Sequence, residues 1–112
     1  MTRDPRQRLD DINAAIERCL SYRTHMESPD ATTASTAYDA VLRNLAVIGE
    51  AVKSLPDDVI ALSPETPWTS IAGLRNVVVH EYFRVNRDLI EQIVDNELTE
   101  LSGTIRNRLR DA

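Results

Sequence analysis

Apolar residues recur at steps of three and four along most of the chain, which is the spacing of one face of an α-helix. In the first such segment Asp4 precedes Pro5, the signature of an N-cap followed by proline in the first helical turn. The pattern fades near His25 and Met26. We therefore predict a helix from about residue 5 to about residue 25, with an apolar face made of Leu9, Ile12, Ile16, Cys19 and Leu20.

The second segment has a stronger pattern and is bounded by turn residues. Residues 27–36, ESPDATTAST, have the composition of a polar loop. Residues 35–56 then read as a helix that Pro56 ends, because proline cannot continue the backbone hydrogen bonding. Residues 57–67, DDVIALSPETP, read as a connector with room for one short helical turn. The apolar face of the second helix consists of Tyr38, Val41, Leu45, Ile48, Val52 and Leu55.

Two further helices complete the predicted fold. Thr66 before Pro67 repeats the cap-then-proline signature and predicts the start of a third main helix. Asn86 is the predicted N-cap of a fourth, whose apolar stripe consists of Leu89, Ile93, Leu98, Leu101, Ile105 and Leu109. Four main amphipathic helices with short connections predict an all-α fold, an antiparallel helical bundle with a further short helix. At 112 residues we expect a single domain, residues 1–112.

Composition limits the cellular compartment and the binding partners that we expect for such a bundle. No apolar run approaches the ~18–20 residues of a membrane span, and the start MTRDPRQRLDD is too polar for a signal peptide. Cys19 is the one cysteine, which excludes a disulfide framework and a cysteine-based metal site, so we expect a reducing cytoplasm. The formal net charge of -5 argues against non-specific nucleic-acid binding. Any contact with nucleic acid must therefore be local or shared with a partner.

The stretch RNVVVHEYF, residues 75–83, stands out within the third helix. Three consecutive valines are mediocre helix formers, and a buried arginine is costly unless it meets an anion. On a regular helical wheel Arg75 falls near the middle of an apolar stripe with Tyr82, whereas Asn76 and His80 lie on a second, polar stripe. Arg75 and His80 are then roughly 140° apart. Either the helix bends or ends here, or a second copy of the chain completes the site.

Each of these residues also has a structural interpretation. Arg75 fits a buried ion pair, His80 fits a partly exposed helix histidine, and Tyr82 fits an aromatic at the edge of the core. Glu50 lies off the apolar stripe of the second helix and reads as solvated, while the neighbouring Gly49 permits close helix packing. The remaining candidates read as structural or solvated: Cys19, His25, Arg106, Arg108 and Arg110.

The spacing R-N-x-x-x-H-x-Y on the third main helix of a small four-helix chain resembles the HEPN superfamily. More closely, it resembles the HepT-type toxins of prokaryotic toxin–antitoxin pairs. The family pattern R-x-x-x-x-H-x-Y matches Arg75, His80 and Tyr82, and its usual polar residue after the arginine matches Asn76. The contexts AVIGEAVKSLP and PWTSIAGLRN also look like this group, and the resemblance covers the chain from about residue 9 to about residue 109.

The resemblance implies a metal-independent endoribonuclease that acts as a homodimer, with the two motif helices facing each other across a two-fold cleft. Arg75 and His80 would be catalytic and Asn76 would support them, with RNA (tRNA or mRNA) as the substrate and no cofactor. It also implies a protein partner, an MntA-type nucleotidyltransferase antitoxin. That partner would attach AMP to Tyr82 and so silence the toxin, as in a type VII-like toxin–antitoxin pair.

The residue types fit this chemistry. RNA is cut without a metal when its own 2′-hydroxyl attacks the adjacent phosphate, which requires a base, an acid and a cation. His80 can act in either protonation state near neutral pH, and Arg75 can grip phosphate oxygens bidentately. One chain offers a single histidine in the motif. A two-fold dimer would offer two, and the small Thr69–Gly73 stretch would let the facing helices approach.

Two other functions stay open at this stage. The bundle could be a non-catalytic nucleotide-binding subunit, or the companion of a minimal nucleotidyltransferase, with Arg75 as a phosphate anchor. It could also be a purely structural dimerisation bundle in which Arg75 is an ion-pair residue. RNA cleavage that is lost on His80→Ala would exclude the first, and a folded but inactive Arg75→Ala variant would exclude the second.

Overall fold

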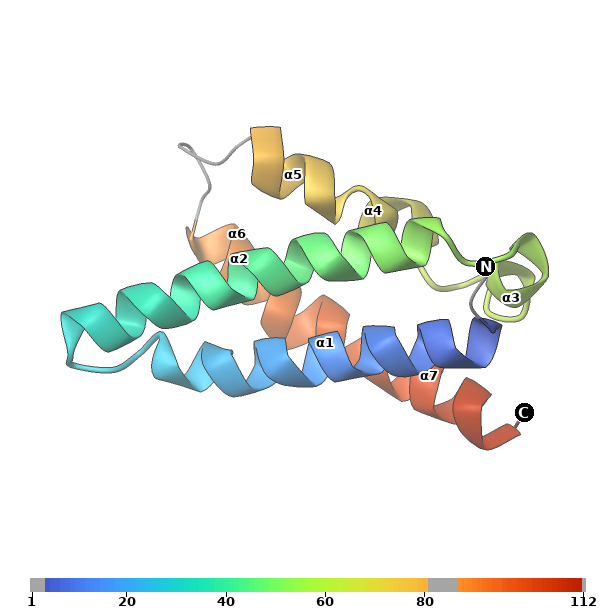
Figure 1. The fold of residues 1–112 in the computed structure, drawn as a ribbon, viewed down its shortest axis with the longest axis horizontal. Coiled ribbons are helices and arrows are strands. Elements are labelled where there is room, and N and C mark those ends of the chain that lie inside the picture. The colour runs from blue at the N-terminus through green and yellow to red at the C-terminus, as the bar shows by residue number, and fades with distance from the viewer. Residues whose placement is uncertain (1–3, 81–86, 112) are drawn as a thin grey trace.

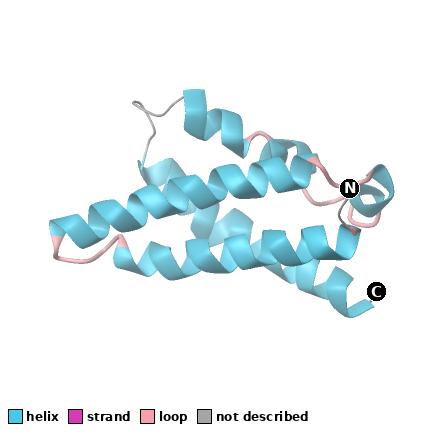
Figure 2. Ribbon diagram, viewed as in Figure 1, coloured by secondary structure: helices cyan, strands magenta, loops and turns pink. Residues whose placement is uncertain are grey.

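The computed structural model describes residues 4–80 and 87–111, and over these ranges every regular element is a helix (Figure 2). The prediction of an all-α helical bundle is confirmed. The long helices α1 and α2 form an antiparallel hairpin, the C-terminal helices run along its far side, and α4 and α5 lie against α2 (Figure 1). The elements are α1 Pro5–His25, α2 Ala31–Lys53, α3 Asp57–Ala61, α4 Trp68–Ala72, α5 Leu74–His80, α6 Arg87–Gln92, the π-helical turn η1 Ile93–Leu98 and α7 Thr99–Asp111.

Side-chain caps begin both long helices. The Asp4 carboxylate accepts a hydrogen bond from the Arg6 backbone N–H at 2.8 Å, and Gln7 accepts from the Asp4 backbone N–H, which completes a capping box. The predicted cap at Asp4 is therefore confirmed. Asp30 caps α2 by accepting from the Thr33 backbone N–H at 2.9 Å. The second helix thus begins at residue 31, inside the stretch that the sequence analysis read as loop, because Asp30 supplies a cap there.

The core lies between the hairpin and the C-terminal helices. Two predicted apolar faces, those of α1 and α2, are buried or pack against the buried core as expected. The largest fully buried side chains are Ile12, Ile16, Met26, Leu45, Ile48, Ile71, Ile90, Leu98, Leu101 and Ile105. Their interdigitation joins α1, α2, α4 and the C-terminal helices into one body, and it supplies the main stabilising term of the fold.

The predicted apolar stripe of the C-terminal helices is wrong at its first residue. The stripe began at Leu89, yet Leu89 is 46% exposed and Ile90 is fully buried instead. Leu89 and Ile90 lie in α6, before the π-helical segment Ile93–Leu98. Across that segment the predicted step of five is confirmed, because a π-helix takes more residues per turn and both Ile93 and Leu98 are buried. Asn86, the predicted cap of this helix, lies outside the described residues.

The connector between α2 and α4 contains the predicted short helix, α3, but the predicted start of the next helix was wrong. α4 begins at Trp68, with Pro67 before it and no side-chain cap. Trp68 is held instead by its indole N–H, which donates to the Ser63 carbonyl at 2.9 Å. A buried tryptophan thus fixes the entry into α4, where a threonine cap was expected.

No helix in the described ranges combines the length and the apolar character needed to cross a lipid bilayer.

Candidate functional site

Arg75 lies at the beginning of α5 and points to solvent over α2. Its side chain is 51% exposed, and its Nε lies 3.1 Å from Oε1 of Glu50, which is 52% exposed. The expectation of an arginine in the middle of the core face was wrong. Leu74, at 4% exposure, takes the core position between Ile71 and Val78. The arginine does make an ion pair, as its structural interpretation held, but the pair is open to water.

A break at Gly73 accounts for this change of register. α4 ends at Ala72 and α5 begins at Leu74, with Gly73 between them as the C-cap of α4. The break falls before Arg75, and the described backbone from Leu74 to His80 is one helix. A regular helix places Arg75 and His80 roughly 140° apart. Bending between the two residues therefore does not bring them together.

Gly49 determines how closely α5 approaches α2. A Cβ atom at Gly49 would lie 2.9 Å from the Arg75 backbone nitrogen and 3.2 Å from the Ile71 carbonyl oxygen. Only glycine leaves room for backbone-to-backbone packing at this crossing, which bears out the interpretation of Gly49 as a close-packing residue. The next residue, Glu50, is thereby brought alongside the Arg75 guanidinium. The pair Gly49–Glu50 thus sets both the position of α5 and the partner of its arginine.

The other predicted site residues are only partly described. Asn76 is exposed, next to Arg75 on α5. His80 is the last residue of α5, and only its backbone falls within the description. Tyr82 lies outside the described residues. The structure therefore locates Arg75 and Asn76 on one exposed helical turn, and the assignments of His80 and Tyr82 stay predictions.

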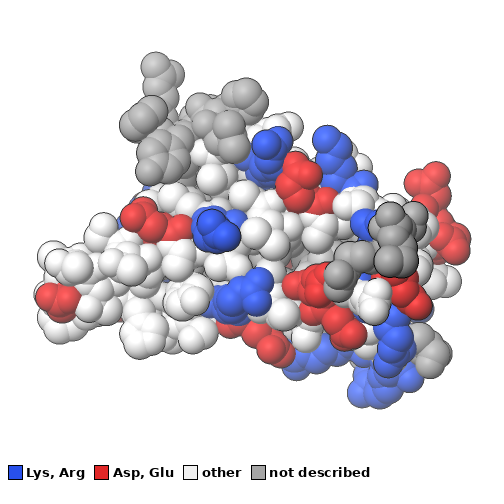
Figure 3. Space-filling view, in the orientation of Figure 1, with Lys and Arg blue, Asp and Glu red and all other residues white. Residues whose placement is uncertain are grey.

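Arg75 borders an open groove between α1, α2 and α5 with a volume of about 610 Å³. Glu50 lines the groove with it, and two more arginines do so, Arg8 from α1 and Arg43 from α2. On the molecular face of Figure 3, basic and acidic side chains are interspersed, and neither sign covers a large continuous area. A phosphate group would therefore find its basic partners in a local cluster, as the net charge of -5 led us to expect.

Three other candidates from the sequence, Cys19, His25 and Arg108, do not line this groove. Burial raises the pKa of the Cys19 thiol to about 12, so it stays protonated and poorly nucleophilic. His25 is exposed at the end of α1. Arg108 was read as solvated, but its Nε donates to Ser63 Oγ at 3.0 Å and its Nη2 donates to the Leu62 carbonyl. It therefore ties α7 to the connector before α4, whose Ser63 carbonyl also accepts the Trp68 indole N–H.

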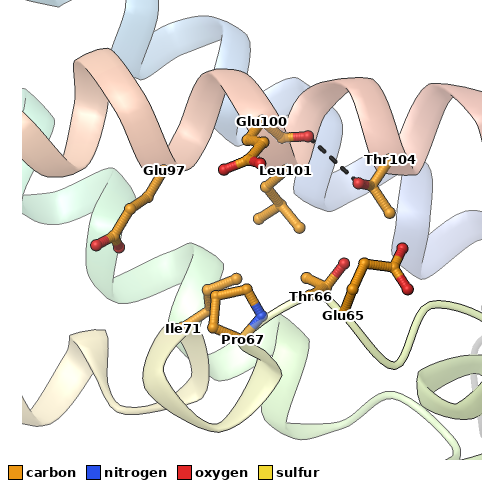
Figure 4. A pocket seen from close by; sticks show the side chains of 8 residues that line it. All are labelled: Glu65, Thr66, Pro67, Ile71, Glu97, Glu100, Leu101 and Thr104. Atoms are coloured by element: carbon orange, nitrogen blue, oxygen red, sulfur yellow. Dashed lines mark hydrogen bonds between the residues drawn. The ribbon is translucent and has the colours of Figure 1, made fainter.

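A smaller pocket of about 90 Å³ lies on another part of the bundle (Figure 4). The carboxylate-bearing residues Glu65, Glu97 and Glu100 line it, together with Thr104, whose hydroxyl donates to the Glu100 carbonyl at 3.3 Å. Acidic walls repel phosphate, so this pocket does not suit RNA. Across the described part of the chain, no group of three or more His, Cys, Asp or Glu side chains is placed to hold a metal ion.

Glu50 is the residue that the sequence analysis missed. Its position off the apolar stripe of α2 was correctly read as exposed, but exposure alone does not exclude a role. The signal was its neighbour: a glycine that permits close helix packing places the following side chain at the crossing point. Gly49 already predicted that another helix packs closely against α2 at this point. A cationic side chain on that helix would then lie near the Glu50 carboxylate.

Comparison with known proteins gives this arrangement its context. The family model described as "Ribonuclease HepT-like" matches residues 12–107. A candidate RNase of Methanocaldococcus jannaschii is 34% identical, over 97% of this chain and 90% of the relative. A probable ribonuclease HepT of Thermococcus cleftensis is 33% identical, over 92% and 94% respectively. No solved structure matches the chain at a significant level. The family model spans most of the bundle, Arg75 and its α5 helix included, and the chain therefore belongs to the HepT-like ribonuclease family.

Proposed function

We propose that this chain is an endoribonuclease toxin that cleaves RNA through its own 2′-hydroxyl, using Arg75 and His80. Family membership supports the ribonuclease class, and the names of the relatives agree with it. The observation that carries the choice of Arg75 is its half-exposed guanidinium at an open groove. An arginine kept only for folding would be expected to have its charge more fully covered by protein.

The ion pair with Glu50 is compatible with phosphate binding. The closest approach to Glu50 uses the Nε of Arg75, and in this scheme the two terminal Nη groups would contact the substrate. Those two nitrogens form the planar fork that matches two oxygens of a phosphate. Glu50 would therefore hold the guanidinium at its Nε side, while the Nη end of the guanidinium faces the substrate.

The proposed step forms one bond and breaks one. The 2′-oxygen bonds to phosphorus as a base removes its proton, and the bond from phosphorus to the 5′-oxygen breaks as an acid protonates that oxygen. The products are a 2′,3′-cyclic phosphate and a 5′-hydroxyl. His80 would supply the base or the acid, Arg75 would stabilise the charge that develops on the phosphorane, and Asn76 would orient either the imidazole or the substrate.

A homodimer is the assembly that best reconciles this chemistry with the helix. Because α5 is a helix through His80, the side chains of Arg75 and His80 in one chain leave the helix axis in different directions. A second chain related by a two-fold axis would supply a second histidine, so that acid and base roles could be divided. Sedimentation at micromolar concentration tests this, with a dimer expected. A Gly73→Trp variant should weaken dimerisation and activity together, and a fully active monomer would remove the shared cleft.

Control by a partner enzyme is the last part of the proposal. An MntA-type nucleotidyltransferase would transfer AMP from ATP to the Tyr82 phenol, forming the bond from oxygen to the α-phosphorus and releasing pyrophosphate. The attached phosphate would then compete with RNA for Arg75. Co-expression should add AMP mass to the peptide that contains Tyr82 and abolish toxicity, whereas Tyr82→Phe should stay unmodified. Modification at another residue would remove Tyr82 from this mechanism.

The experiment that tests the nuclease itself compares purified variants on RNA. Wild-type chain should cleave, and Arg75→Ala and His80→Ala should each fail to cleave while keeping wild-type helical content by circular dichroism. Arg106→Ala is the matched control, since it removes an exposed arginine on α7 away from the groove. Cleavage should persist in excess chelator. Full cleavage by the His80→Ala variant would overturn the assignment.

A further inference from the structure

The groove beside Arg75 holds two more arginines, Arg8 and Arg43, that the proposed chemistry does not use. Its described lining includes three arginines and two acidic residues: Arg8, Arg43, Arg75, Asp11 and Glu50. The lining is therefore basic by one charge in a chain whose formal net charge is -5. An anion that approaches this protein is attracted locally to the groove, while the molecule as a whole repels it.

Arg43 is the arginine of the groove whose charge no described carboxylate covers. It is exposed on α2 and makes no ion pair or hydrogen bond with a described residue. Arg75 is paired with Glu50, and Arg8 and Asp11 each have contacts of their own within the protein. Of the three arginines that line the groove, Arg43 is thus the one whose binding to an external anion would break no contact with a described residue.

The position of Arg43 relative to Arg75 fixes what it would bind. Arg43, Val47 and Glu50 follow one another at steps of four and three, so they share one face of α2. Arg43 lies seven residues from Glu50, or roughly 10 Å along the helix axis. With Arg75 at the cleaved phosphate, Arg43 is placed about two helical turns of α2 further along the groove, where it would contact a different phosphate of the same strand. Between them the floor is small or apolar, with Ala46, Val47 and Ala51.

We propose that this groove binds the RNA strand on one side of the cleaved bond, with Arg43 contacting a phosphate that is not cut. This inference rests on the proposed function, because Arg75 marks where the strand enters. The described lining contains no aromatic side chain on which a base could stack. The groove therefore recognises the sugar–phosphate backbone, and it adds affinity without sequence preference.

Substrate length separates this role from catalysis. A dinucleotide has one phosphodiester and cannot reach Arg43, whereas an oligonucleotide of about ten residues can. Arg43→Ala should raise KM for the oligonucleotide and leave kcat and dinucleotide cleavage unchanged. Binding of a 2′-O-methyl oligonucleotide, which cannot be cut, should weaken. The slope of log affinity against log salt should fall by about 0.7, the loss of one single-strand phosphate contact. Between 50 and 200 mM salt this slope change amounts to about a threefold difference.

The matched control is again Arg106→Ala, which removes the same charge outside the groove. Equal behaviour of the two variants on the oligonucleotide would overturn the inference. So would a loss of dinucleotide cleavage in Arg43→Ala, because Arg43 would then act at the cut phosphate. Unchanged RNA binding with lost binding of a purified protein partner would make the groove a protein-docking surface and also overturn it. Failure of the proposed function looks different: the wild type would cleave neither substrate.

Discussion

Two arginines of this bundle, Arg23 and Arg75, illustrate opposite uses of the same side chain. Arg23 on α1 is 18% exposed, and its guanidinium faces three carboxylates at once. Its Nε and Nη2 donate to the two oxygens of Asp95 at 3.0 and 3.2 Å, and its Nη1 donates to Glu27 at 2.9 Å. Arg75 is 51% exposed and has one described carboxylate partner.

The two arginines differ in how far their N–H donors are used in contacts within the protein. The donors of Arg23 are taken up by Glu27, in the turn after α1, and by Asp95 of η1, so Arg23 joins the hairpin to the C-terminal helices and leaves nothing for a ligand. Arg75 pairs with Glu50 alone among the described carboxylates, and its half-exposed side chain lines an open groove. A saturated arginine stabilises a fold, whereas a singly paired one at an open groove is equipped to bind an anion.

The largest expected effect is on RNA cleavage, when the arginine assigned to function is removed. Arg75→Ala should lower the rate of RNA cleavage by roughly 10²–10³-fold, the usual cost of removing a group that stabilises a developing oxyanion. The free energy of unfolding should change little, because the side chain is half exposed. Single-turnover cleavage and denaturant unfolding measure the two quantities. A variant that unfolds while its residual activity per folded molecule is normal would make Arg75 structural.

The next effect tests the close packing that places Arg75. Gly49→Ala introduces a Cβ atom 2.9 Å from the Arg75 backbone nitrogen, so α5 must move away from α2. We expect a loss of about 1–3 kcal/mol in the free energy of unfolding together with reduced cleavage. Gly103→Ala on α7 is the matched control, since nothing lies within 4 Å of its added Cβ. That variant should gain about 0.5–1 kcal/mol from helix propensity.

Arg23→Ala is expected to act on stability alone. Removing it deprives Asp95 and Glu27 of their shared partner, and we expect a loss of about 1–2 kcal/mol in the free energy of unfolding. The rate of RNA cleavage per folded molecule should equal that of the wild type. Urea unfolding and cleavage assays on the same preparation compare the two. Loss of cleavage with unchanged stability would reverse the roles assigned to the two arginines.

Glu50→Gln should produce a smaller change, confined to the site. The amide keeps the shape of the carboxylate but loses the charge that orients Arg75, and exposed pairs of this kind contribute up to about 1 kcal/mol. We expect cleavage to fall by no more than about fivefold, with KM rising more than kcat falls, because the guanidinium is held less firmly for binding. A drop as large as that of Arg75→Ala would show that Glu50 itself acts in the chemistry.

The smallest effect is a pH dependence of stability at the Arg23 network. The hydrogen bond from Arg23 lowers the pKa of Glu27 below its ordinary value of 4.5. A lowered folded pKa stabilises the fold above the ordinary value, and that contribution is lost as pH falls through the folded pKa. Wild type should therefore lose stability on going from pH 5 to pH 3, and Arg23→Ala should lose less. Parallel pH profiles for the two proteins would exclude the coupling.

The hydrophobic pattern predicted the long helices because their faces are regular and their caps are local. Asp4 with Pro5 marks the start of α1 in sequence alone, and the step of three and four along α2 continues without a break. The pattern failed at a helix break and at the end of a stripe. Gly73 shifts the register of α5 and exposes Arg75, and at the start of α6 Ile90 is buried in place of Leu89.

The motif spacing proposes the residues of the candidate site but not their contacts. It selects Arg75, Asn76, His80 and Tyr82 by type and order along a helix, and their roles stay predictions. Glu50 was not selected, because its pairing with Arg75 depends on a tertiary approach between two helices. Pair contacts between distant segments become visible only when the packing is known.

Identification of the RNA ends tests the central claim, attack by the RNA's own 2′-hydroxyl, most directly. Wild-type chain is incubated in excess chelator with an RNA oligonucleotide and, separately, with the same sequence in 2′-O-methyl form, and the products are weighed by mass spectrometry. The account predicts a 2′,3′-cyclic phosphate on one fragment, a 5′-hydroxyl on the other, and no cleavage of the 2′-O-methyl strand. Products with a 5′-phosphate and a 3′-hydroxyl, or cleavage of the 2′-O-methyl strand, would contradict it.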